Sequence, residues 1–396
     1  MAEETLDYVV REMTHPDGGF YSTQDADSEG VEGEFFVWTV EEVEAVLGLE
    51  DAALFMAAYD VTSGGNFEGR SILRVIRTAE ELAAAEGLES REAEERLASA
   101  RARLMAVREK RVRPARDEKI LAAWNGLMIA AFAEAAAAFG RSDYRVVAER
   151  AAAVVLARHR GLDGRLLRSW KDGRARLNGY LEDHTHMIEG LLALYQTDFS
   201  PVWFAAAREL ADVMLGAFAA PAAGFFDTRD DHETLIVRPQ DFQDNAVPSG
   251  NSMAATVLLK LAALSGESRY QMAAEGALAG IQGFLAGHPL AFGQWLIAHD
   301  AATGGGGEIA IVGSPDDPAT RALVKVVRER YRPGWVVAAG PPVGTAAAPP
   351  VVPLLEDRHL VDGRSAAHVC RESTCRAPIT DPEALRVELD SAQPTP

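Results

Sequence analysis

The sequence predicts an all-α protein whose main body is a ring of paired helices, an (α/α)6 barrel. Two patterns along residues 1–303 predict it. Helical segments with one polar face alternate with segments that carry little charge, and a short loop motif recurs between them. Because an outer helix needs a polar face and an inner helix does not, the alternation indicates an exposed ring around a buried ring. The 396 residues leave room for six helical hairpins and a small addition.

The helical segments follow one another in pairs. Those with a charged outer face are residues 2–14, 91–110, 142–159, 201–219 and 267–287. Those with little charge on any side are residues 120–139, 181–196, 249–265 and 289–299. Trp124, His184 and Asn251 mark the second group at intervals of 60 and 67 residues, the length of one hairpin with a sizeable loop.

The loops between the segments repeat as well. Residues 19–27 read GFYSTQDAD and residues 224–232 read GFFDTRDDH, at an offset of 205 residues, and a weaker copy (DGRLLRS) occupies 163–169. Each copy follows a predicted outer helix, where glycine supplies a turn and the apolar pair anchors the loop. Such repeats imply a closed or stacked array of hairpins. Six hairpins closed into a barrel fit the length best, and an open solenoid fits less well because the loops are long and varied.

The sequence changes character after Thr303. A glycine run leads to a buried-strand pattern at 308–312, a helix at 318–330 and a second strand at 335–338, which predicts a βαβ unit. Five prolines in 341–353 indicate an extended, semi-rigid segment. We therefore expect three regions: a barrel (1–303), a small βαβ unit (304–340) and a Pro-rich segment with a C-terminal tail that packs on the barrel (341–396).

Charge excludes two classes of partner. The chain has 59 acidic and 39 basic side chains and a net charge of −20, whereas nucleic acids and anionic membranes attract basic surfaces. Residues 120–139 are apolar enough to suggest a membrane span, but Asn125, Gly126 and Glu134 interrupt them. An apolar helix with such interruptions is typical of a buried inner helix. We expect neither a nucleic acid nor a membrane as partner.

Cysteine content and the first residues indicate a cytoplasmic protein. The acidic start has no basic segment and no apolar run, so it is not a signal peptide. Cys370 and Cys375 are the two cysteines, which is no disulfide framework and suits a reducing compartment. Their spacing lacks the two-residue gap of a redox or zinc motif, so we expect a structural role or a packed thiol. A redox role for the pair is the weaker alternative.

Polar side chains gather where the buried helices are expected to begin. In a barrel of hairpins these N-termini converge on one mouth, and their free N–H groups favour anions there. Carboxylates, amides and tryptophans around such a mouth suit a sugar-like ligand, because carboxylates accept hydroxyl protons and indoles stack on a sugar ring. We predict Asp27, Asp183, His184 and Asp244 as catalytic groups. Ligand contacts are predicted for Asp25, Trp38, Asp117, Trp124, Asn125, Glu182, His186, Ser249, Asn251 and Gln294.

Each of these residues also has a purely structural interpretation. Asp117 and Asp183 suit helix N-caps, which stabilise a helix by about 1 kcal/mol. Ser249 suits an N-cap too, with Gly250 allowing close helix packing. His184 lies on the apolar face of its helix, as a core histidine does, but its imidazole titrates near neutrality and makes it the best acid–base candidate.

No cofactor or metal is predicted. The sequence contains no G-x-G-x-x-G and no P-loop, and the run 304–307 lacks the lysine and hydroxyl of a phosphate site. Glu182, His186 and Glu189 share a helical stripe that suits a metal ion, but no other segment supplies a well-spaced ligand.

Several longer strings resemble a known family. They are GGFYSTQDADSEG (18–30), GEFFVWT (33–39), GNFEGRSIL (65–73), DEKILAAWNGLMI (117–129), YLEDHTHMIEGLLALY (180–195), PSGNSMAA (248–255) and HVCRESTCRAPITDPEAL (368–385). Together they resemble the thioredoxin-domain-containing family of bacterial YyaL and animal spermatogenesis-associated protein 20, over nearly the whole chain. The resemblance implies a six-hairpin glycosidase-like barrel, related in shape to N-acylglucosamine and cellobiose 2-epimerases.

The resemblance has one large departure. Family members carry an N-terminal thioredoxin-like domain, and this chain begins after the point where that domain ends. Thioredoxin chemistry is therefore not carried over to this chain. A thioredoxin-like domain or protein remains a possible partner, in addition to a sugar-like ligand.

Three functions follow as hypotheses. Sugar epimerisation needs two groups on opposite faces, for which His184 with His186 or His232 is the available pair. Glycoside hydrolysis needs two carboxylates, one of them protonated, for which Asp25 or Asp27 with Asp183 or Asp244 is available. The alternative is a non-catalytic scaffold that partners a thioredoxin-like domain. An open aromatic-lined pocket with a perturbed pKa would favour an enzyme, whereas a plugged interior with every acid paired would favour the scaffold.

Overall fold

The chain forms two compact units. The computed structural model describes residues 1–161, 165–233, 236–343, 352–371 and 374–391. Unit 1 comprises Met1–Ser22 and Lys119–Pro396, and unit 2 comprises Thr23–Glu118. This division differs from the expected single barrel over 1–303, because the helices of unit 2 bury their apolar faces against one another in a core of their own.

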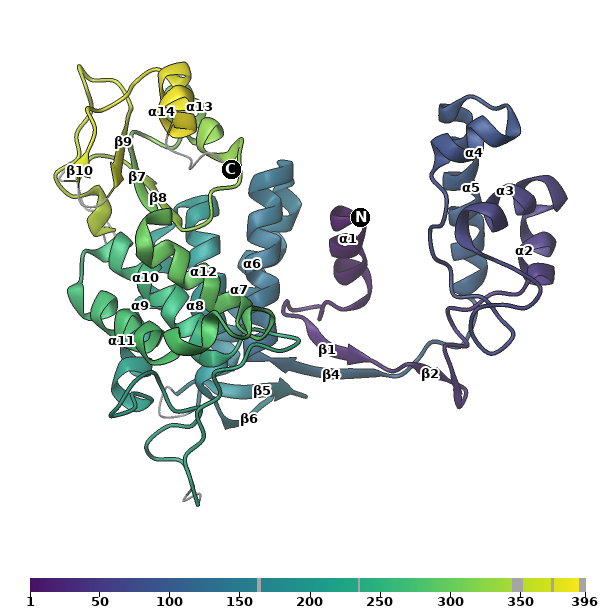
Figure 1. Ribbon diagram of the computed structural model, residues 1–396, viewed down its shortest axis with the longest axis horizontal. Helices are drawn as coiled ribbons and strands as arrows, with labels where there is room; N and C mark the ends of the chain where they lie inside the picture. The colour runs from purple at the N-terminus through teal and green to yellow at the C-terminus, as the bar shows by residue number, and fades with distance from the viewer. Residues whose placement is uncertain (162–164, 234–235, 344–351, 372–373, 392–396) are drawn as a thin grey trace. The chain divides into compact units, whose positions relative to one another are not determined.

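Unit 1 consists mainly of helices (Figure 1). They are α1 (Ala2–Glu12), α6 (Ala122–Phe139), α7 (Ser142–Arg158), α8 (Leu181–Asp198), α9 (Pro201–Ala217), α10 (Gly250–Ser265), α11 (Ser268–Leu285), α12 (Gly293–Asp300), α13 (Pro318–Arg328) and α14 (Pro382–Ser391), with short turns η1 (Pro289–Ala291), η2 (Ala301–Gly305) and η3 (Pro353–Leu355). The nine helical segments expected from the sequence are all helical. The chain is not all-α, however, because it also contains sheets.

Helices α6, α8, α10 and α12 lie in a row, each against the next, and α7, α9 and α11 each return along the preceding one. The inner helices are buried on most sides, as α8 is from Leu181 to Tyr195, whereas α7 buries one stripe that includes Tyr144 and Val155. The alternation of charge in the sequence therefore reflects two helical layers. The described residues hold three complete hairpins of this kind, and closure into a ring of six stays a prediction.

Two glycines allow α6 and α8 to cross closely. A Cβ atom on Gly126 would lie 2.3 Å from the backbone carbonyl of His186, and one on Gly190 would lie 2.5 Å from the carbonyl oxygen of Gly126. Real Cβ atoms do not approach other atoms this closely, so any side chain at either position would push the helices apart. The apolar composition of α6 follows from this packing. Within the described residues α6 is the helix long and apolar enough to cross a membrane, and 56% of that stretch is buried in the protein.

The repeated loops have the same backbone structure three times. After α1, α7 and α9 the chain closes a small bridge, which joins Thr14 to Phe20, Arg160 to Leu166 and Ala219 to Phe225. In each copy the residue after the bridge donates a backbone hydrogen bond to the C-cap residue that follows the helix: Tyr21 to Met13, Leu167 to His159 and Phe226 to Phe218, all at 2.8 Å. The apolar residue of each bridge is buried. This confirms the internal repeat, including its weaker copy, of which residues 162–164 lie outside the described ones.

Each repeated loop leads from an outer helix to the next inner helix. Unit 2 is inserted in the first of them, between α1 and α6. The second holds the hairpin of β5 (Leu167–Lys171) and β6 (Arg174–Asn178), and the third is a long loop before α10. β1 (Tyr21–Gln24) and β4 (Arg116–Leu121) carry the chain between the units, and the four strands form a sheet of order β1-β4-β5-β6.

The predicted βαβ unit is present and larger than expected. β7 (Gly307–Val312) and β8 (Trp335–Gly340) pair in parallel around α13, and β9 (Ala366–Arg371) and β10 (Thr374–Cys375) extend the sheet in the order β10-β9-β7-β8. Successive residues of β7 face opposite sides: Ala310 and Val312 join the core of the inner helices, whereas Ile309 and Ile311 pack with α13 and α14. In the tail, Val352, Leu354 and Leu355 also join the core of the inner helices. Most of the Pro-rich segment 341–353 lies outside the described residues.

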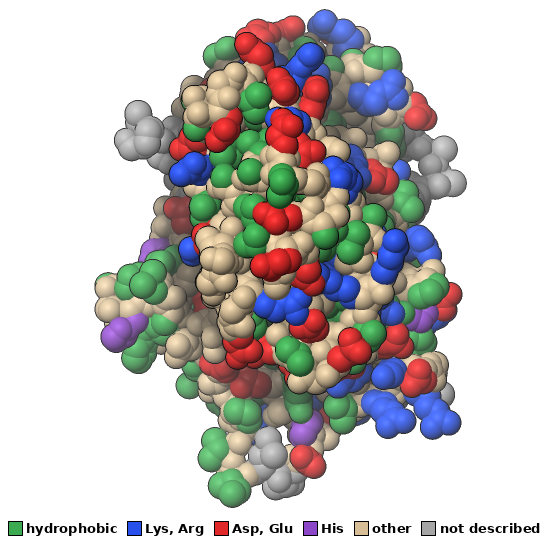
Figure 2. Space-filling model, turned by 90° about the vertical axis from the view of Figure 1, so that its right-hand side faces the viewer, with side chains coloured by type: hydrophobic (Ala, Val, Ile, Leu, Met, Phe, Trp, Pro, Cys, Tyr) green, Lys and Arg blue, Asp and Glu red, His purple; other side chains and the backbone are tan. Residues whose placement is uncertain are grey.

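Unit 2 is a small helical unit. The sequence patterns predicted only the last of its helices. It contains α2 (Val40–Leu47), α3 (Leu49–Tyr59), α4 (Ala79–Glu86), α5 (Ser90–Arg108) and a hairpin of β2 (Asp27–Ser28) and β3 (Val31–Glu32). Thr39 and Thr78 form capping boxes with Glu42 and Glu81 that start α2 and α4. Figure 2 shows acidic and basic side chains interspersed on the face in view, rather than a patch of one sign.

Candidate functional site

Asp183 lies fully buried at the start of α8 and joins the N-termini of two inner helices. Its Oδ1 accepts a hydrogen bond from the backbone N–H of Ala123 in α6 (3.0 Å), and its Oδ2 accepts one from Tyr180 (2.9 Å). Arg168 lies 3.3 Å from the same carboxylate and 2.6 Å from Glu182. Burial raises the pKa of Asp183 to about 6, against the opposing effect of Arg168 and of the two N–H groups.

Asp244 performs the same task for the next two inner helices. Its Oδ1 accepts hydrogen bonds from Ser249 N–H (2.9 Å) and the Ser252 hydroxyl (2.6 Å) at the start of α10. Its Oδ2 accepts one from the N–H of Gln294 in α12 (2.8 Å). Ser249 is also the N-cap of α10. The two acids thus connect four helix N-termini in pairs, where the positive ends of the helices favour carboxylates.

Asn125 and Asn251 hold the repeated loops. Asn125 Oδ1 accepts from the backbone N–H of Phe20 (2.7 Å) and its Nδ2 donates to the Phe20 carbonyl (3.0 Å). Asn251 forms the same two bonds with Phe225, at 2.7 and 2.9 Å. Both side chains are buried, and their hydrogen bonds all go to backbone groups. These contacts support the structural interpretation of both amides over ligand contact.

The two histidines of α8 are core residues. His184 is fully buried; its Nδ1 lies 3.0 Å from the Tyr180 carbonyl oxygen and its ring packs on Phe218. Burial lowers the pKa of His184 to about 4, against the effect of that carbonyl. His186 is fully buried as well, with Nε2 3.2 Å from the Pro248 carbonyl oxygen, and burial also lowers its pKa. Neutral, enclosed imidazoles suit packing better than proton transfer at neutral pH.

The remaining predicted site residues are distributed between the two units. In unit 1, Gln294 donates to the Thr256 hydroxyl (2.8 Å), and Trp124 is 42% exposed at the start of α6. In unit 2, Trp38 is buried under the Arg111 guanidinium. The other three, Asp25, Asp27 and Asp117, belong to unit 2 as well. The Asp25 carboxylate accepts a hydrogen bond from the backbone N–H of Asp27 (3.2 Å), and Asp117 lies in β4.

A second polar group lies farther along the inner helices, and the sequence prediction missed it. Lys260 of α10 forms an ion pair with Glu189 of α8 at 2.5 Å. Glu134 of α6 adjoins the pair: burial raises its pKa, the Glu189 charge raises it further, and Lys260 opposes both. Burial by itself lowers the pKa of Lys260, but attraction to Glu189 and Glu134 outweighs it and the net direction is upward. We name Glu134, Glu189 and Lys260 the inner charge cluster.

A signal for this cluster is present in the sequence. Glu134 is the single charged residue of α6, and Lys260 is the single charged residue of α10. A lone charge in the middle of an otherwise uncharged helix needs a partner, since an unpaired buried charge is costly. The pattern does not say which lone charges meet, because that depends on the rotation of each helix.

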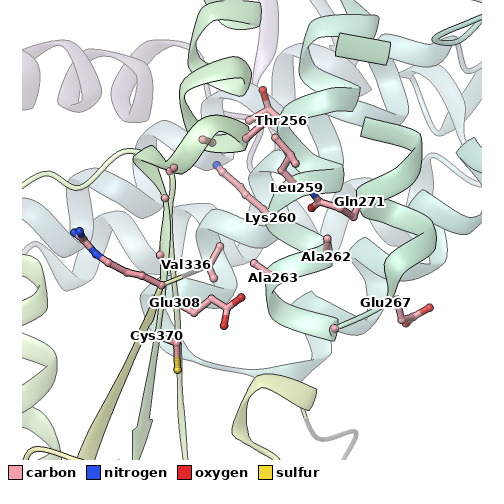
Figure 3. A pocket seen from close by; sticks show the side chains of 18 of the residues that line it. Thr256, Leu259, Lys260, Ala262, Ala263, Glu267, Gln271, Glu308, Val336 and Cys370 are labelled. Atoms are coloured by element: carbon pink, nitrogen blue, oxygen red, sulfur yellow. The ribbon is translucent and has the colours of Figure 1, made fainter. Parts of the chain in front are cut away.

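A cavity of about 550 Å³ adjoins Lys260, between α10, α11 and the C-terminal sheet. Figure 3 shows Lys260 extending from α10 towards the sheet and Glu308 extending from β7 towards the helix. The lining combines apolar groups such as Leu259 and Val336 with the polar side chains of Thr256 and Gln271. None of the lining residues is aromatic, which differs from the expected tryptophan platform. The volume falls within the range of small-molecule pockets, about 300–1,000 Å³.

Of the two alternatives for the cysteines, the packed thiol is wrong. Cys370 and Cys375 form a disulfide. The two residues are direct partners across the antiparallel strands β9 and β10, with their Cα atoms 4.0 Å apart, so the pairing of the strands brings the sulfurs together. Cys370 also lines the cavity.

Among the described residues no group of three or more histidine, cysteine, aspartate or glutamate side chains is arranged to hold a metal ion. The helical stripe of Glu182, His186 and Glu189 had suggested a metal site. Two of its members have other partners, since Glu182 pairs with Arg168 and Glu189 with Lys260.

Comparison with solved structures finds partial similarity to sugar enzymes. Cellobiose 2-epimerase from Bacillus thermoamylovorans aligns with 72% of this chain and 70% of its own at 10% identity and a TM-score of 0.38. A GH76 α-mannanase from Bacteroides thetaiotaomicron aligns with 83% and 76% at 12% identity and a TM-score of 0.37. A D-mannose isomerase aligns with 76% and 69% at 15% identity and a TM-score of 0.34.

Sequence comparison gives a more extensive match. No protein-family model matches the chain. Spermatogenesis-associated protein 20 is 31% identical in Homo sapiens and 30% identical in Mus musculus, in each case over 98% of this chain and over 54% and 53% of the relative. The chain is therefore similar along almost its whole length to spermatogenesis-associated protein 20, and it spans about half the length of these curated relatives.

Proposed function

We propose that unit 1 binds a carbohydrate in the cavity beside Lys260 and acts on it by acid–base chemistry through the inner charge cluster. One observation carries the proposal: charged side chains of three adjacent inner helices interact, with Glu189 and Lys260 2.5 Å apart, and Lys260 lines a cavity of about 550 Å³. Lys260 and Glu189 are only 22% and 12% exposed. Charges are kept in such a position at a cost in desolvation, so an ion pair that adjoins a cavity suits a functional site.

The polar groups of the cavity match a polyhydroxylated ligand. The Lys260 ammonium and the Gln271 amide offer donors, and the Glu308 carboxylate offers an acceptor. Leu259 and Val336 supply apolar surface for the C–H face of a sugar. A pocket that is mostly apolar with a few fixed polar groups is the usual form of a small-molecule site.

The two carboxyl groups of the inner charge cluster have different environments. Glu134 has a raised pKa, from burial and from the neighbouring Glu189 charge, and this favours its protonated form. Glu189 instead forms the ion pair with Lys260. Two nearby carboxyls with different surroundings suit the roles of a general acid and a general base. We assign the acid role to Glu134 and the base role to Glu189.

A second candidate is a non-catalytic scaffold for a thioredoxin-like partner. The predicted mouth favours it: Asp183 is paired with Arg168, Asp244 is bonded to backbone groups of two helices, and His184 and His186 are enclosed. In this alternative the same acids only fix helix positions, and no sugar binds near Lys260.

Thermal shifts with a panel of millimolar mono- and disaccharides separate the two candidates. A ligand raises stability by RT ln(1 + [L]/Kd), so even weak binding raises the Tm. We expect a shift for one class of sugar in the wild type, and loss of that shift in Lys260→Met. Glu149→Gln on the outer helix α7 is the control, because Glu149 pairs with Arg145 in the same helix, and it should keep the shift.

The reaction is tested with the sugar that binds. Glu134→Gln should retain binding and lose turnover, because the amide keeps the shape but cannot donate a proton as an acid. If no sugar in the panel raises the Tm of the wild type, or if Lys260→Met responds as the wild type does, the carbohydrate proposal is refuted and the scaffold stands.

A further inference from the structure

The two sulfurs of the Cys370–Cys375 disulfide differ in accessibility. Cys370 lies in the central part of the C-terminal sheet and is 2% exposed, whereas Cys375 lies in the edge strand β10 and is exposed. A thiolate must reach a sulfur along the S–S axis to displace the other one. A thiolate from solvent can therefore reach the sulfur of Cys375 but not that of Cys370.

A guanidinium lies against both sulfurs. Nη2 of Arg358 is 3.2 Å from Cys375 Sγ and 3.5 Å from Cys370 Sγ. Nε of Arg358 is buried and has no hydrogen-bond partner among the described residues. A positive group beside a cysteine stabilises its thiolate, and a neutral disulfide makes little use of such a charge. The unused donor and the charge both suit a thiolate that forms when the disulfide opens.

We propose that the Cys370–Cys375 disulfide is a thiol-exchange site for a small thiol, in which Cys375 is attacked and Cys370 leaves as a thiolate held by Arg358. In the first step the thiolate of the small thiol forms a bond to Cys375 Sγ, the Cys370–Cys375 bond breaks, and its electron pair remains on Cys370 Sγ. In the second step another small thiol displaces Cys375 from the mixed disulfide. Two small thiols are oxidised to their disulfide, and the two cysteines gain two electrons and two protons.

The place of Cys370 gives the exchange a structural consequence. Cys370 lines the cavity, and Glu308, which also lines it, is its direct partner across β7 and β9. Burial raises the pKa of Glu308, with Arg358 opposing. When the disulfide opens, a thiolate forms in the cavity wall beside Arg358, and the two-residue strand β10 loses its covalent link to β9. The exchange therefore changes both the charge of the cavity wall and the freedom of the sheet edge.

Mass spectrometry after rapid alkylation tests the proposal on the folded chain. We expect glutathione to reduce the wild type and, in Cys370→Ser, its oxidised form to add to Cys375. Arg358→Met should slow reduction about threefold or more, since exchange is faster when the leaving thiol has a lower pKa. Arg358→Lys keeps the charge and should stay near the wild-type rate, and Arg364→Gln, at an exposed arginine of the preceding turn, is the matched control.

Three results would overturn the proposal. The first is a wild-type disulfide that resists glutathione until the protein unfolds. The second is an adduct that forms on Cys370 of Cys375→Ser faster than on Cys375 of Cys370→Ser. The third is an Arg358→Met variant that is folded by circular dichroism and is reduced at the wild-type rate. A purely structural disulfide gives the first result, and the order of attack distinguishes the sulfurs even if an arginine variant misfolds.

Discussion

The carboxylate of Asp183 accepts a hydrogen bond from the backbone N–H of Ala123, 60 residues earlier in the chain and on the neighbouring inner helix. The same carboxylate binds the N–H of Tyr180 before its own helix. One side chain therefore fixes the positions of the N-termini of α6 and α8 along their axes relative to each other. It acts between two helices as a capping residue acts within one.

The raised pKa of Asp183 makes stability depend on pH. The pKa is about 6 in the folded protein and has an ordinary value of 3.8, so the folded state binds this proton more tightly. Its contribution is complete below pH 3.8 and is lost as pH rises through 6, and it amounts to about 3 kcal/mol. Asp183→Asn should lack this component, so the difference in unfolding free energy between variant and wild type should change across this window. Denaturant titrations at several pH values measure it, and a constant difference would contradict the prediction.

The repeated asparagines give a prediction about the loops. Asn125→Leu removes both hydrogen bonds to Phe20 and leaves a buried backbone N–H and carbonyl without these partners. Each unsatisfied group costs about 1–3 kcal/mol, so we expect a loss of about 2–6 kcal/mol in the unfolding free energy. Asn251→Leu should behave alike through Phe225, since its two bonds are the same. Asn178→Leu, at an exposed position of β6, is the control and should change stability little.

Comparison of these particular residues shows what sequence patterns can predict here. The recurrence of Gly-Phe at 19–20 and 224–225 predicted equivalent loops, and the equivalent bridges of Phe20 and Phe225 confirm it. The role of Asn125 was not predicted, because an amide in a polar cluster is compatible with a ligand or with a loop. Only the position of the distant Phe20 backbone decides between them.

The misplaced boundaries have a physical origin too. Unit 2 stands within a loop of the repeat, and three of its helices lie between residues 40 and 86, where alanine and glutamate give a weak apolar stripe. Periodicity shows which face of a helix is buried but not which element it packs against. The separate core of unit 2, which contains Val43, Phe55 and Leu97, therefore could not be predicted from it. The Cys370–Cys375 disulfide was not predicted for a similar reason, since it depends on the register of β9 and β10.

The close crossing of α6 and α8 predicts a strong effect of a single methyl group. Gly126→Ala places a Cβ within 2.3 Å of the His186 backbone carbonyl, which cannot move without shifting α8. We expect destabilisation of about 1–3 kcal/mol or more from overpacking. Gly283→Ala on the outer helix α11, where nothing lies within 4 Å of the added carbon, should instead stabilise by up to about 1 kcal/mol through helix propensity. Equal effects of the two substitutions in thermal melts would contradict the crossing.

The ion pair of the inner charge cluster predicts a non-additive double mutant. Lys260→Met alone leaves Glu189 without its partner and next to Glu134, so two carboxyls face each other in a partly buried site. Removing one member of a buried pair costs about 3–5 kcal/mol, whereas replacing both members with uncharged groups costs far less. The double variant Glu189→Gln with Lys260→Met should therefore be more stable than Lys260→Met alone.

A double-mutant cycle of unfolding free energies measures this coupling, with Arg145→Met and Glu149→Gln on α7 as the surface pair for comparison. Exposed pairs contribute about 0–1 kcal/mol, so the control cycle should be nearly additive. Because loss of Lys260 also removes the group that opposes the raised pKa of Glu134, the Lys260→Met deficit should grow as pH rises and Glu134 ionises. A deficit that is the same at acid and neutral pH would show that Glu134 and Glu189 do not interact, and the acid–base assignment would lose its basis.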